Sequence, residues 1–559
     1  MHVFGTHRTW WQRLRLTTRK ELGAGNFFWH ACDVAGDLDR PLLHRIEAGA
    51  VHGYSLAELR GRVLRYVDWH REHGVAAGSR VAVYTTDGLA GLLHHIAVTS
   101  LGGATVLANP KMAPVTAAHY FDRTDSELLV ADAALVTAIG AGLGRRPCVA
   151  VEEVEAEATG SVAASWRPYA NRDTDLVLVS HSSGTTGVPK PTSFAHRTFA
   201  VGKRERLWNF PSARTDRLVT ALPQSHSAGI SYLSLAILLG LPTLMCDDPS
   251  GAAVAEAMNA FLPTVVIGFP VSLADLAVTD LSERAKQAVH TWMGMGDASH
   301  ERHIRPLLDI GRRPGPRGSW RGGSTYVDGL GSSEMGMVLF KNPHTPETAR
   351  FGRLIGRPVR VVESAAALDG DGVEVPVGEA GLLGVRTPSV TPGYVNDPEL
   401  TAGARASGYF LTGDVVRKDT NGDWYHLDRT PDVITTADGP VYSLPLEEVV
   451  LNETRAFDAA VVAVDSAAGD GTSEAAAVVL FKADAAQDPR ELLIRCNRAL
   501  DGVGIGRLAA LVIAYDREEL PVGVTGKVLK RVLRDRHRSL LTADHSADVA
   551  VDVATQIRP

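Results

Sequence analysis

The sequence has few cysteines and no excess of positive charge. Its four cysteines lie far apart and form no Cys-x-x-Cys pair. This spacing indicates neither a zinc site nor a disulfide framework, so we expect a protein of the reducing cytoplasm. The formal net charge of −7 argues against a general nucleic-acid partner. The cysteines are Cys32, Cys148, Cys246 and Cys496.

Long uninterrupted apolar runs are also missing. Residues 1–20 carry several arginines but no continuous apolar stretch, which excludes a secretory signal. We expect a basic surface helix near Trp10–Leu16, with a transit peptide as the alternative. The segment 228–246 is almost wholly apolar but contains Ser231 and Ser234. It predicts a buried helix that runs into a strand, and no membrane span.

What the sequence does have is the composition and patterning of a globular α/β protein. It is 45% hydrophobic and 22% charged, and its 559 residues are too many for one core. Apolar runs that predict buried strands alternate with helical patterns such as Leu56–His73 and Val254–Phe261, which is typical of layered, largely parallel sheets. The predicted strands are Arg80–Tyr84, Ala104–Leu107, Leu128–Val130, Leu176–Val179 and Thr264–Ile267.

The character of the chain changes near residue 430. A hairpin from Val433 and a small α+β pattern of strands and helices follow, and the tail is polar and rich in alanine. We therefore predict an amino-terminal domain of several subdomains over residues 1–429, a small carboxy-terminal domain over 430–541 and a loose tail over 542–559. The elements predicted in the small domain are helices at Pro445–Leu451 and Asp488–Leu500 and strands at Ala459–Val464, Ala475–Phe481 and Ala509–Ala514.

A hydroxyl-rich loop follows the strand that ends near Ser180. Two glycines let successive backbone amides point into one concavity, which attracts phosphate oxygens, and Lys190 adds a point charge. The alternative is an ordinary Ser/Thr/Gly surface loop. The loop is not a Walker loop, because Gly-Lys-Ser/Thr is absent. The predicted phosphate contacts are Ser182, Ser183, Gly184, Thr185, Thr186, Gly187 and Lys190.

The run Ser-Gly-Thr-Thr-Gly-x-Pro-Lys at 183–190 resembles the signature loop of the adenylate-forming superfamily, which includes acyl-CoA synthetases, peptide-synthetase adenylation domains and luciferases. The resemblance implies a large amino-terminal domain, a small mobile carboxy-terminal lid domain, and ATP with Mg²⁺ between them. Further motifs occur in the family's order over roughly residues 50 to 540. They are Leu222–Gly229, Trp292–Ala298, Asp328–Glu334, Gly408–Asp414 and Pro521–Lys527.

These motifs imply a role for each matching residue. His226 would border the substrate carboxylate, Glu334 would hold Mg²⁺, Asp414 would accept from the ribose hydroxyls, and Arg429 would lie near ribose and phosphate. Lys527 would come from the lid to the carboxylate. The catalytic set implied by the resemblance is Lys527, Glu334, His226 and Thr185. The other implied nucleotide contacts are Gly296, Asp297, Ala298, Asp328, Gly329, Leu330 and Ser333.

The sequence departs from the family pattern at the expected hinge. The usual Gly-Arg is Asp428-Arg429, and the pivot two positions after the arginine is Pro431. Proline fixes φ near −65°, which is unusual where the backbone must rotate. One hypothesis is that adenylation is intact while transfer to a thiol is slow or is delegated to another protein. The alternative is that neighbouring backbone angles absorb the rotation.

The expected substrate pocket consists mostly of small and apolar residues, and no acidic residue occurs between Ala221 and Met245. An amino-acid substrate would need such an acid for its amino group, so we expect a bulky aryl, alicyclic or fatty carboxylic acid. The expected acceptor is CoA or a thiol of a carrier protein, which would be a separate chain because no Gly-x-Ser attachment site follows Lys527. The predicted pocket residues are His226, Gly229, Gly268, Phe269, Gly331 and Met335.

Three alternatives remain open at this point. A stand-alone adenylation enzyme that charges a separate carrier protein or partner enzyme would differ only in the thiol it accepts. An oxidative luciferase is possible within the superfamily, although no residue argues for it. A non-catalytic acyl- or nucleotide-binding protein would have lost Lys527 or Glu334, and both are present.

Overall fold

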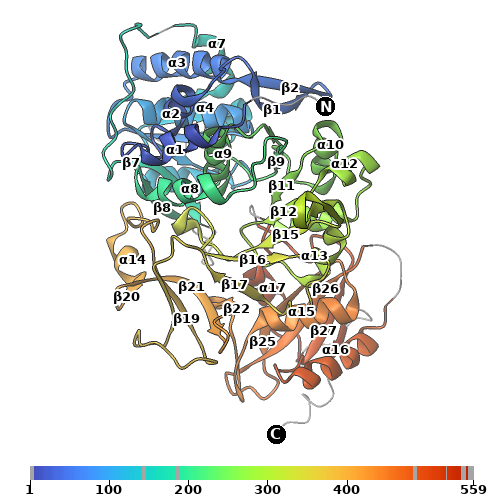
Figure 1. Cartoon of the computed structure of the whole chain (residues 1–559). Coiled ribbons are helices and arrows are strands. Elements are labelled where there is room, and N and C mark those ends of the chain that lie inside the picture. The colour runs from blue at the N-terminus through green and yellow to red at the C-terminus, as the bar shows by residue number, and fades with distance from the viewer. Residues whose placement is uncertain are drawn as a thin grey trace.

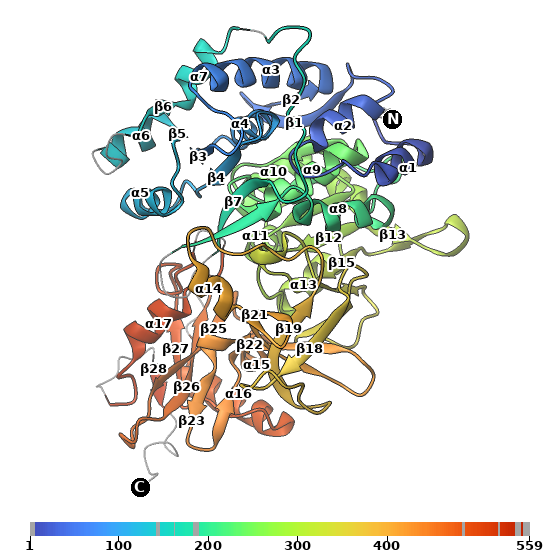
Figure 2. The same ribbon diagram turned by 90° about the vertical axis from the view of Figure 1, so that its left-hand side faces the viewer.

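The computed structural model of the chain describes residues 6–140, 146–160, 162–182, 189–482, 487–523, 526–542 and 549–551. Figure 1 shows helices and sheets of the amino-terminal half at the top and the carboxy-terminal strands and helices at the bottom. Figure 2 gives the same arrangement from the side. The predicted α/β class is confirmed, because the two largest sheets each have a parallel centre and are covered by helices.

A six-stranded sheet carries the first part of the chain. All its neighbouring strands are parallel except β7 and β8, which form a hairpin with Ser182 opposite Lys190. The predicted phosphate loop therefore connects two paired strands. In order across the sheet, the strands are β6 (Cys148–Ala150), β5 (Leu128–Ala131), β3 (Arg80–Tyr84), β4 (Ala104–Leu107), β7 (Leu176–Ser182) and β8 (Lys190–Ala195).

Helices surround this sheet, and side chains cap the starts of α3 and α4. Ser55 and Glu58 form a reciprocal capping box at the start of α3, each side chain accepting from the other residue's backbone amide. The helix α4 is buried along its whole length, as its apolar sequence requires. The helices are α3 (Leu56–Glu72), α4 (Gly88–Ser100), α5 (Pro114–Arg123), α6 (Ala133–Ile139) and α7 (Val151–Glu157).

A second, larger sheet has a parallel centre. Because these strands are parallel, their carboxyl ends meet at one edge, where open α/β sheets bind ligands. Gly268, Gly294 and Asp328 are the last residues of three of them. In order, the central strands are β15 (Thr325–Asp328), β12 (Thr291–Gly294), β11 (Val265–Gly268), β9 (Leu218–Thr220) and β10 (Thr243–Met245), followed by β1 (Pro41–Glu47) and β2 (Ala50–Ser55).

The apolar segment 228–246 forms the buried helix α9 (Ser227–Leu239) and then strand β10, as predicted. Within the described residues, no helix has the length and apolar character needed to cross a bilayer. The predicted basic helix at the amino terminus is α1 (Trp10–Thr18), which exposes Trp10, Trp11, Arg15 and Thr18 and buries Leu16. The other helices of this part are α2 (Phe27–Val34), α8 (Thr198–Asn209), α10 (Gly251–Phe261), α11 (Pro270–Ala277), α12 (Glu283–Ala288) and α13 (Glu301–Leu308).

Antiparallel strands extend the large sheet beyond β15. In this extension Asp414 of β21 lies directly opposite Arg429 of β22, so strand register alone brings these two predicted nucleotide contacts together. In order, the strands are β16 (Phe340–His344), β17 (Leu354–Pro358), β22 (Trp424–Arg429), β21 (Tyr409–Lys418), β19 (Ala380–Arg386) and β18 (Ser364–Leu368). The short strand β20 (Arg405–Ala406) and helix α14 (Pro398–Gly403) lie beside β21.

The carboxy-terminal part has its own four-stranded sheet and its own core. A cluster of buried apolar side chains draws its described members only from Ile434 onward. The predicted boundary near residue 429 remains a prediction. The elements are β23 (Ile434–Thr436), β24 (Gly439–Val441), α15 (Ser443–Thr454), β25 (Asp458–Asp465), β26 (Ser473–Leu480), α16 (Pro489–Val503), β27 (Ala510–Ala514), α17 (Lys530–His537) and β28 (Val549–Val551).

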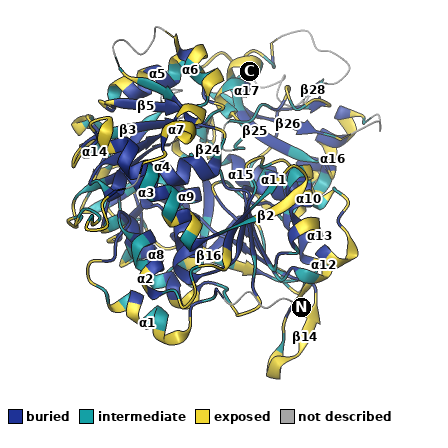
Figure 3. Ribbon diagram, turned by 90° about the horizontal axis from the view of Figure 1, so that it is seen from above, coloured by how far each residue is buried: buried dark blue, intermediate teal, exposed yellow. Residues whose placement is uncertain are grey.

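One expectation for this part needs correction. Strand β28 lies within the segment 542–559, which the polar sequence predicts as a loose tail, and it pairs antiparallel with β27. Alanine and valine side chains explain the difference, because Ala550 is buried in the core of this sheet. Figure 3 shows that burial is concentrated in the sheets and the inner helices, while the outer turns are exposed.

Candidate active site

Two cavities meet at Lys527. One has a volume of about 430 Å³ and the other about 410 Å³, and Gly296, Gly331, Arg429 and Lys527 line both. Lys527 comes from the carboxy-terminal part, whereas Gly296 and Gly331 lie just after strands β12 and β15 of the large sheet and Arg429 ends β22 of its extension. A lysine of the small part therefore lies at the carboxyl edge of the parallel strands. We call the two spaces the polar cavity and the apolar cavity.

The polar cavity contains eight of the twelve described residues that were predicted to contact the nucleotide. Asp414 and Arg429 form an ion pair of 3.2 Å between Oδ1 and Nε, and His426 Nε2 lies 3.4 Å from the same oxygen. Burial opposes ionisation of Asp414, but Arg429 and His426 outweigh it and hold its pKa below the usual range. The predicted residues that line this cavity are Gly296, Asp297, Ala298, Gly329, Leu330, Gly331, Asp414, Arg429 and Lys527.

The apolar cavity combines a few polar groups with an apolar wall. His226, Lys190, Glu334 and Lys527 all line it. Lys190 directly follows the predicted phosphate loop, so that loop's end and the lysine of the small part reach the same space. The wall comes from Ala228, Tyr232, Phe269, Met295, Met337 and Val338. Such a cavity suits an acid whose carboxylate lies at the polar end and whose body is apolar.

Lys527 is surrounded by charges of both signs. Burial lowers its pKa below the usual lysine value, although Asp297, Asp414 and Glu334 act in the opposite direction. Arg429 adds to the lowering. An anion entering between Lys527 and Arg429 would relieve their mutual repulsion, so this position favours a phosphate or a carboxylate.

His226 is neutral in this environment. Burial, with smaller effects of His181 and Lys527, lowers its pKa to about 3. Its Nδ1 accepts from the backbone amide of Ala228 at 3.2 Å, which caps α9 and assigns the ring proton to Nε2. A neutral ring with Nε2–H donates a hydrogen bond to an acid oxygen without adding charge.

Glu334 is held by two hydroxyl groups. Its Oε2 accepts from Ser332 at 2.7 Å, and its Oε1 accepts from Tyr394 at 3.1 Å. Lys190 lies 5.9 Å from the centre of the Tyr394 ring. Among the described residues no group of three His, Cys, Asp or Glu side chains could hold a metal ion. A single oriented carboxylate fits Mg²⁺, which binds through one or two carboxylates together with substrate phosphates.

Not every predicted pocket residue reaches a cavity. Gly229 packs against the chain, since an added Cβ would lie 2.1 Å from the carbonyl oxygen of Pro223. Met335 belongs to a buried apolar cluster, and Gly268 and Asp328 are also absent from the walls of both cavities. The lining residues that the predicted pocket did not include are, among others, Ala228, Tyr232, Met295, Met337, Val338 and Tyr394.

Five predicted phosphate-loop residues lie outside the described residues: Ser183, Gly184, Thr185, Thr186 and Gly187. Ser182 ends β7, and Lys190 begins β8. Ser333 lines the apolar cavity beside Glu334, and so does Pro431, the residue at the expected hinge. Pro431 lies in a short 3₁₀ turn, Thr430–Asp432, directly after β22.

A buried network of charges joins the two parts of the molecule next to Lys527. His300, which precedes α13, lies 2.8 Å from Glu448 and 3.6 Å from Glu447, both on α15. Glu447 also lies 2.6 Å from Lys530. Although burial acts against the charged form, the two glutamates raise the pKa of His300 to about 9. Lys530, with His300, lowers the pKa of Glu447 to about 2 against its burial.

Asp428 joins this network from the large part. Its Oδ2 accepts from the backbone amide of Ser443 at 2.6 Å, and its Oδ1 accepts from the Ser443 hydroxyl at 2.8 Å. Ser443 is the first residue of α15. Asp428, which stands where the family has glycine, therefore binds the amino terminus of α15. A carboxylate at this position also interacts favourably with the helix dipole.

These features define a class: a protein of two parts, in which a buried lysine of the small part lies in a cavity at the carboxyl edge of a parallel sheet. Residues 31–395 match the family described as AMP-binding enzymes. The chain is 35% identical over 550 residues to 3-aminoavenalumate diazotase of a Streptomyces species, covering 94% of this chain and 98% of that protein. It is 25% identical over 521 residues to 3-hydroxybenzoate–CoA ligase of Aromatoleum, covering 89% and 94%.

A solved anthranilate CoA ligase in complex with anthranoyl-AMP has the same fold. Its TM-score is 0.80 at 17% identity, over 93% of this chain and 98% of that one. The chain belongs to the AMP-binding enzyme family and is an adenylate-forming enzyme of the ligase type. The resemblance found in the motifs is thereby confirmed.

Proposed function

We propose that the enzyme activates a bulky apolar carboxylic acid, of the aryl, alicyclic or fatty class, as its acyl-adenylate and releases pyrophosphate. The observation that carries this proposal is the position of Lys527 between the polar and the apolar cavity. An acid in the apolar cavity and a nucleotide in the polar cavity would meet at this ammonium group. Among the described residues that line the apolar cavity, the one acidic side chain is Glu334, which is held by Ser332 and Tyr394. No acid occurs between Ala221 and Met245, which disfavours an amino-acid substrate.

In the proposed reaction a carboxylate oxygen attacks the α-phosphorus of ATP, and the bond to the β,γ-diphosphate breaks. Both reactants are anions, so the protein must neutralise charge and align them. Lys527 would contact the carboxylate and the α-phosphate, and His226 would donate to the second carboxylate oxygen. Alignment of this kind lowers the activation free energy by on the order of several kcal/mol.

The remaining predicted contacts keep their proposed roles. Asp414 would accept from the ribose hydroxyls with Arg429 beside it, and Gly296–Ala298 with Asp328–Leu330 would border adenine. The loop 182–187 with Lys190 and Ser333 would bind the phosphates. Mg²⁺ held by Glu334 would stabilise the charge on the departing pyrophosphate. Thr185, as a hydroxyl donor of that loop, would act on the same charge.

We propose further that transfer of the acyl group to a thiol is slow in the isolated chain. Asp428 ties β22 to the first turn of α15, and Pro431 restrains the segment between them. The acceptor would be CoA or, through a docked partner that moves the lid, a carrier protein or partner enzyme. The four cysteines are free, which supports our placement of the enzyme in the cytoplasm.

A second candidate function follows from one comparison. The diazotase shares 35% identity with this chain almost from end to end, whereas 3-hydroxybenzoate–CoA ligase shares 25%. Nitrite is an oxyanion and could attack the α-phosphorus as a carboxylate does. Pyrophosphate would leave, and the product would be an anhydride of nitrite with AMP. An aromatic amine would then attack the nitrogen of this anhydride and release AMP and a proton, and the resulting nitrosamine would take up a proton and lose water to give a diazonium group. This chemistry has no thiol step, in agreement with the restrained hinge.

One experiment separates these functions. Exchange of labelled pyrophosphate into ATP should depend on an aryl, alicyclic or fatty acid, tested over a panel, and not on nitrite. Exchange that requires nitrite, together with formation of a diazonium product from an added aryl amine, would select the second candidate. Absence of exchange with every acid and with nitrite would contradict both and leave a non-catalytic binding protein. Separate assays with CoA and with pantetheinylated carriers then identify the acceptor.

A further inference from the structure

Four of the nine tryptophans are exposed, which is unusual for side chains of this size. Their exposed fractions are 56% for Trp10, 69% for Trp11, 38% for Trp208 and 53% for Trp320. None of them lines either cavity of the active site. A shared location would therefore indicate a second functional surface.

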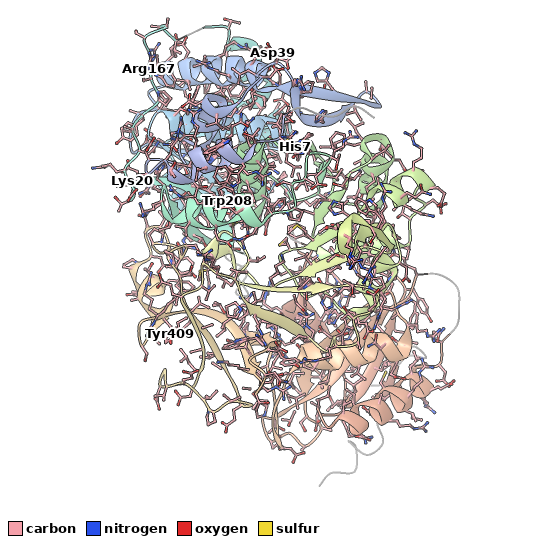
Figure 4. The ribbon with its side chains drawn as sticks, in the orientation of Figure 1. His7, Lys20, Asp39, Arg167, Trp208 and Tyr409 are labelled. Atoms are coloured by element: carbon pink, nitrogen blue, oxygen red, sulfur yellow. The ribbon has the colours of Figure 1, made fainter. Side chains whose placement is uncertain are left out.

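The first three tryptophans form one group. The rings of Trp10 and Trp11 are 4.6 Å apart, and those of Trp10 and Trp208 are 6.1 Å apart. Trp208 at the end of α8 donates to the hydroxyl of Thr17 on α1 at 3.1 Å. Figure 4 labels Trp208 and, on the same side of the upper part, Lys20 just after α1.

Trp320 lies on a hairpin that projects from the same face. The hairpin consists of β13 (Arg312–Pro314) and β14 (Trp320–Gly322), and the guanidinium of Arg312 lies 4.6 Å from the centre of the Trp320 ring. In Figure 2 this hairpin and α1 both extend to the right, and in Figure 3 α1 and β14 both lie at the lower edge. We call the surface formed by α1, Trp208 and this hairpin the tryptophan face.

Contacts between the two groups place the tryptophan face at the amino ends of the parallel strands. His7 contacts the carbonyl of Asp216, whose carboxylate lies 2.9 Å from His290. These two residues precede β9 and β12, and the amide of Arg312 donates to the carbonyl of Val289. The cavities lie at the opposite, carboxyl edge of the same strands. A ligand on the tryptophan face would leave the active site open.

The two segments that carry the tryptophan face are basic although the chain is acidic overall. No acidic residue occurs over 6–20, which holds five cations, or over 311–327, which holds four arginines. Arg8 among their cations is buried, and the exposed acids Glu21, Asp33 and Glu347 border the segments. Arg13 and Arg313 are engaged with neighbouring groups of the protein, and Arg19 pairs with Asp33. Within residues 6–20 and 311–327, the exposed cations that form no ion pair with a described residue are Arg15, Lys20, Arg312, Arg317 and Arg321.

We propose that the tryptophan face binds the surface of an anionic lipid bilayer as a peripheral contact. Tryptophan rings favour the headgroup region, and arginine and lysine bind anionic headgroups there. The two groups are separate projections on one face, and a bilayer offers negative charge at every lateral position. A protein partner would have to match their spacing. Binding in this orientation would leave the apolar cavity, at the opposite edge of the strands, open to the aqueous phase.

The test is flotation of the full-length protein with vesicles of phosphatidylcholine alone or with about 30 mol% phosphatidylglycerol. We expect at least about fivefold more bound protein on the anionic vesicles at low salt, and loss of this excess in about 0.5 M NaCl. R317E/R321E should bind at least about threefold less. The matched control R490E/R498E, which changes exposed arginines of α16 by the same charge, should bind as the parent does.

A second measurement tests the aromatic part and the rival occupants. W10S/W11S/W320S should lose the blue shift of tryptophan emission that the parent shows with anionic vesicles, while its thermal unfolding stays unchanged. Equal binding to neutral and anionic vesicles, or unchanged binding of R317E/R321E, would overturn the proposal. Dimers that disappear in W10S/W11S/W320S would also overturn it, because the face would then join two copies. Binding of an acidic protein without vesicle binding would do the same.

Discussion

The carboxylate of Asp428 binds both the backbone amide and the hydroxyl of Ser443, at 2.6 and 2.8 Å. One residue precedes the expected hinge and the other begins the first helix after it. Burial raises the pKa of Asp428, while Lys530 and the Ser443 hydrogen bonds act against this rise. A rotation of the lid about the expected hinge would therefore have to break this buried contact.

This contact predicts how the balance between the two half-reactions can be changed. Hydrogen bonds to a charged group contribute about 1.5–3 kcal/mol each, so D428G/P431D should release the lid. We expect acyl-CoA formation to rise at least about tenfold relative to acyl-AMP, with pyrophosphate exchange falling by no more than a few fold. Quenched-flow reactions analysed for both products measure the ratio. D371N, in an exposed loop, is the control. An unchanged ratio would contradict the hinge hypothesis.

Lys527 should determine the alkaline limit of adenylation. Only the ammonium form can neutralise the reacting anions, and burial lowers its pKa, so kcat/KM should fall as pH rises through a value below 10.5. K527R should move this limit upward, because a guanidinium keeps its charge. K527A should lose on the order of 10²–10³ in exchange rate and show no such limit. A limit that stays in place in K527R would assign it to another group.

The buried network at His300 should make lid docking depend on pH. The pKa of His300 is about 9 in the folded protein against 6.5 as a free side chain, so its contribution is complete below pH 6.5 and is lost as pH rises through 9. The contribution is on the order of 3 kcal/mol. The difference in thermal stability between the parent and H300Q should therefore be largest near pH 6 and shrink toward pH 10. H119Q, at an exposed histidine, should show no such difference, and a constant difference for H300Q would contradict the prediction.

The sequence predicted the architecture and the polar end of the site better than the apolar end. Strands Arg80–Tyr84 and Ala104–Leu107 have the predicted bounds, because continuous buried Val/Ala/Leu runs leave little choice. Asp414 and Arg429 lie opposite each other because the register of β21 and β22 pairs them. Their 15-residue spacing alone does not show this pairing, and only the family motifs pointed to it.

The apolar wall was harder to predict for a physical reason. Met335 and Met337 are two residues apart, and a 3₁₀ turn over Ser333–Met335 with Gly336 at positive φ decides which of them faces the cavity. The turn buries Met335 in the core and leaves Met337 on the cavity wall. Tyr232 lies on a helix that is apolar on all sides, so periodicity gives it no direction. The same apolar residue types form the cavity wall and the hydrophobic core, so residue type alone does not tell the two apart.

Tyr394 provides a last test, because it acts on the proposed metal ligand and was not predicted as a site residue. Its hydroxyl donates to Glu334 Oε1, and removal leaves that oxygen without its orienting partner. Y394F should raise the Mg²⁺ concentration that gives half-maximal exchange about tenfold, with little change in the KM for the acid. Y409F removes a hydroxyl that contacts Ser364 instead and should change neither quantity. If Y394F altered only the KM for the acid, Tyr394 would contact the substrate, and Glu334 would be oriented through Ser332 alone.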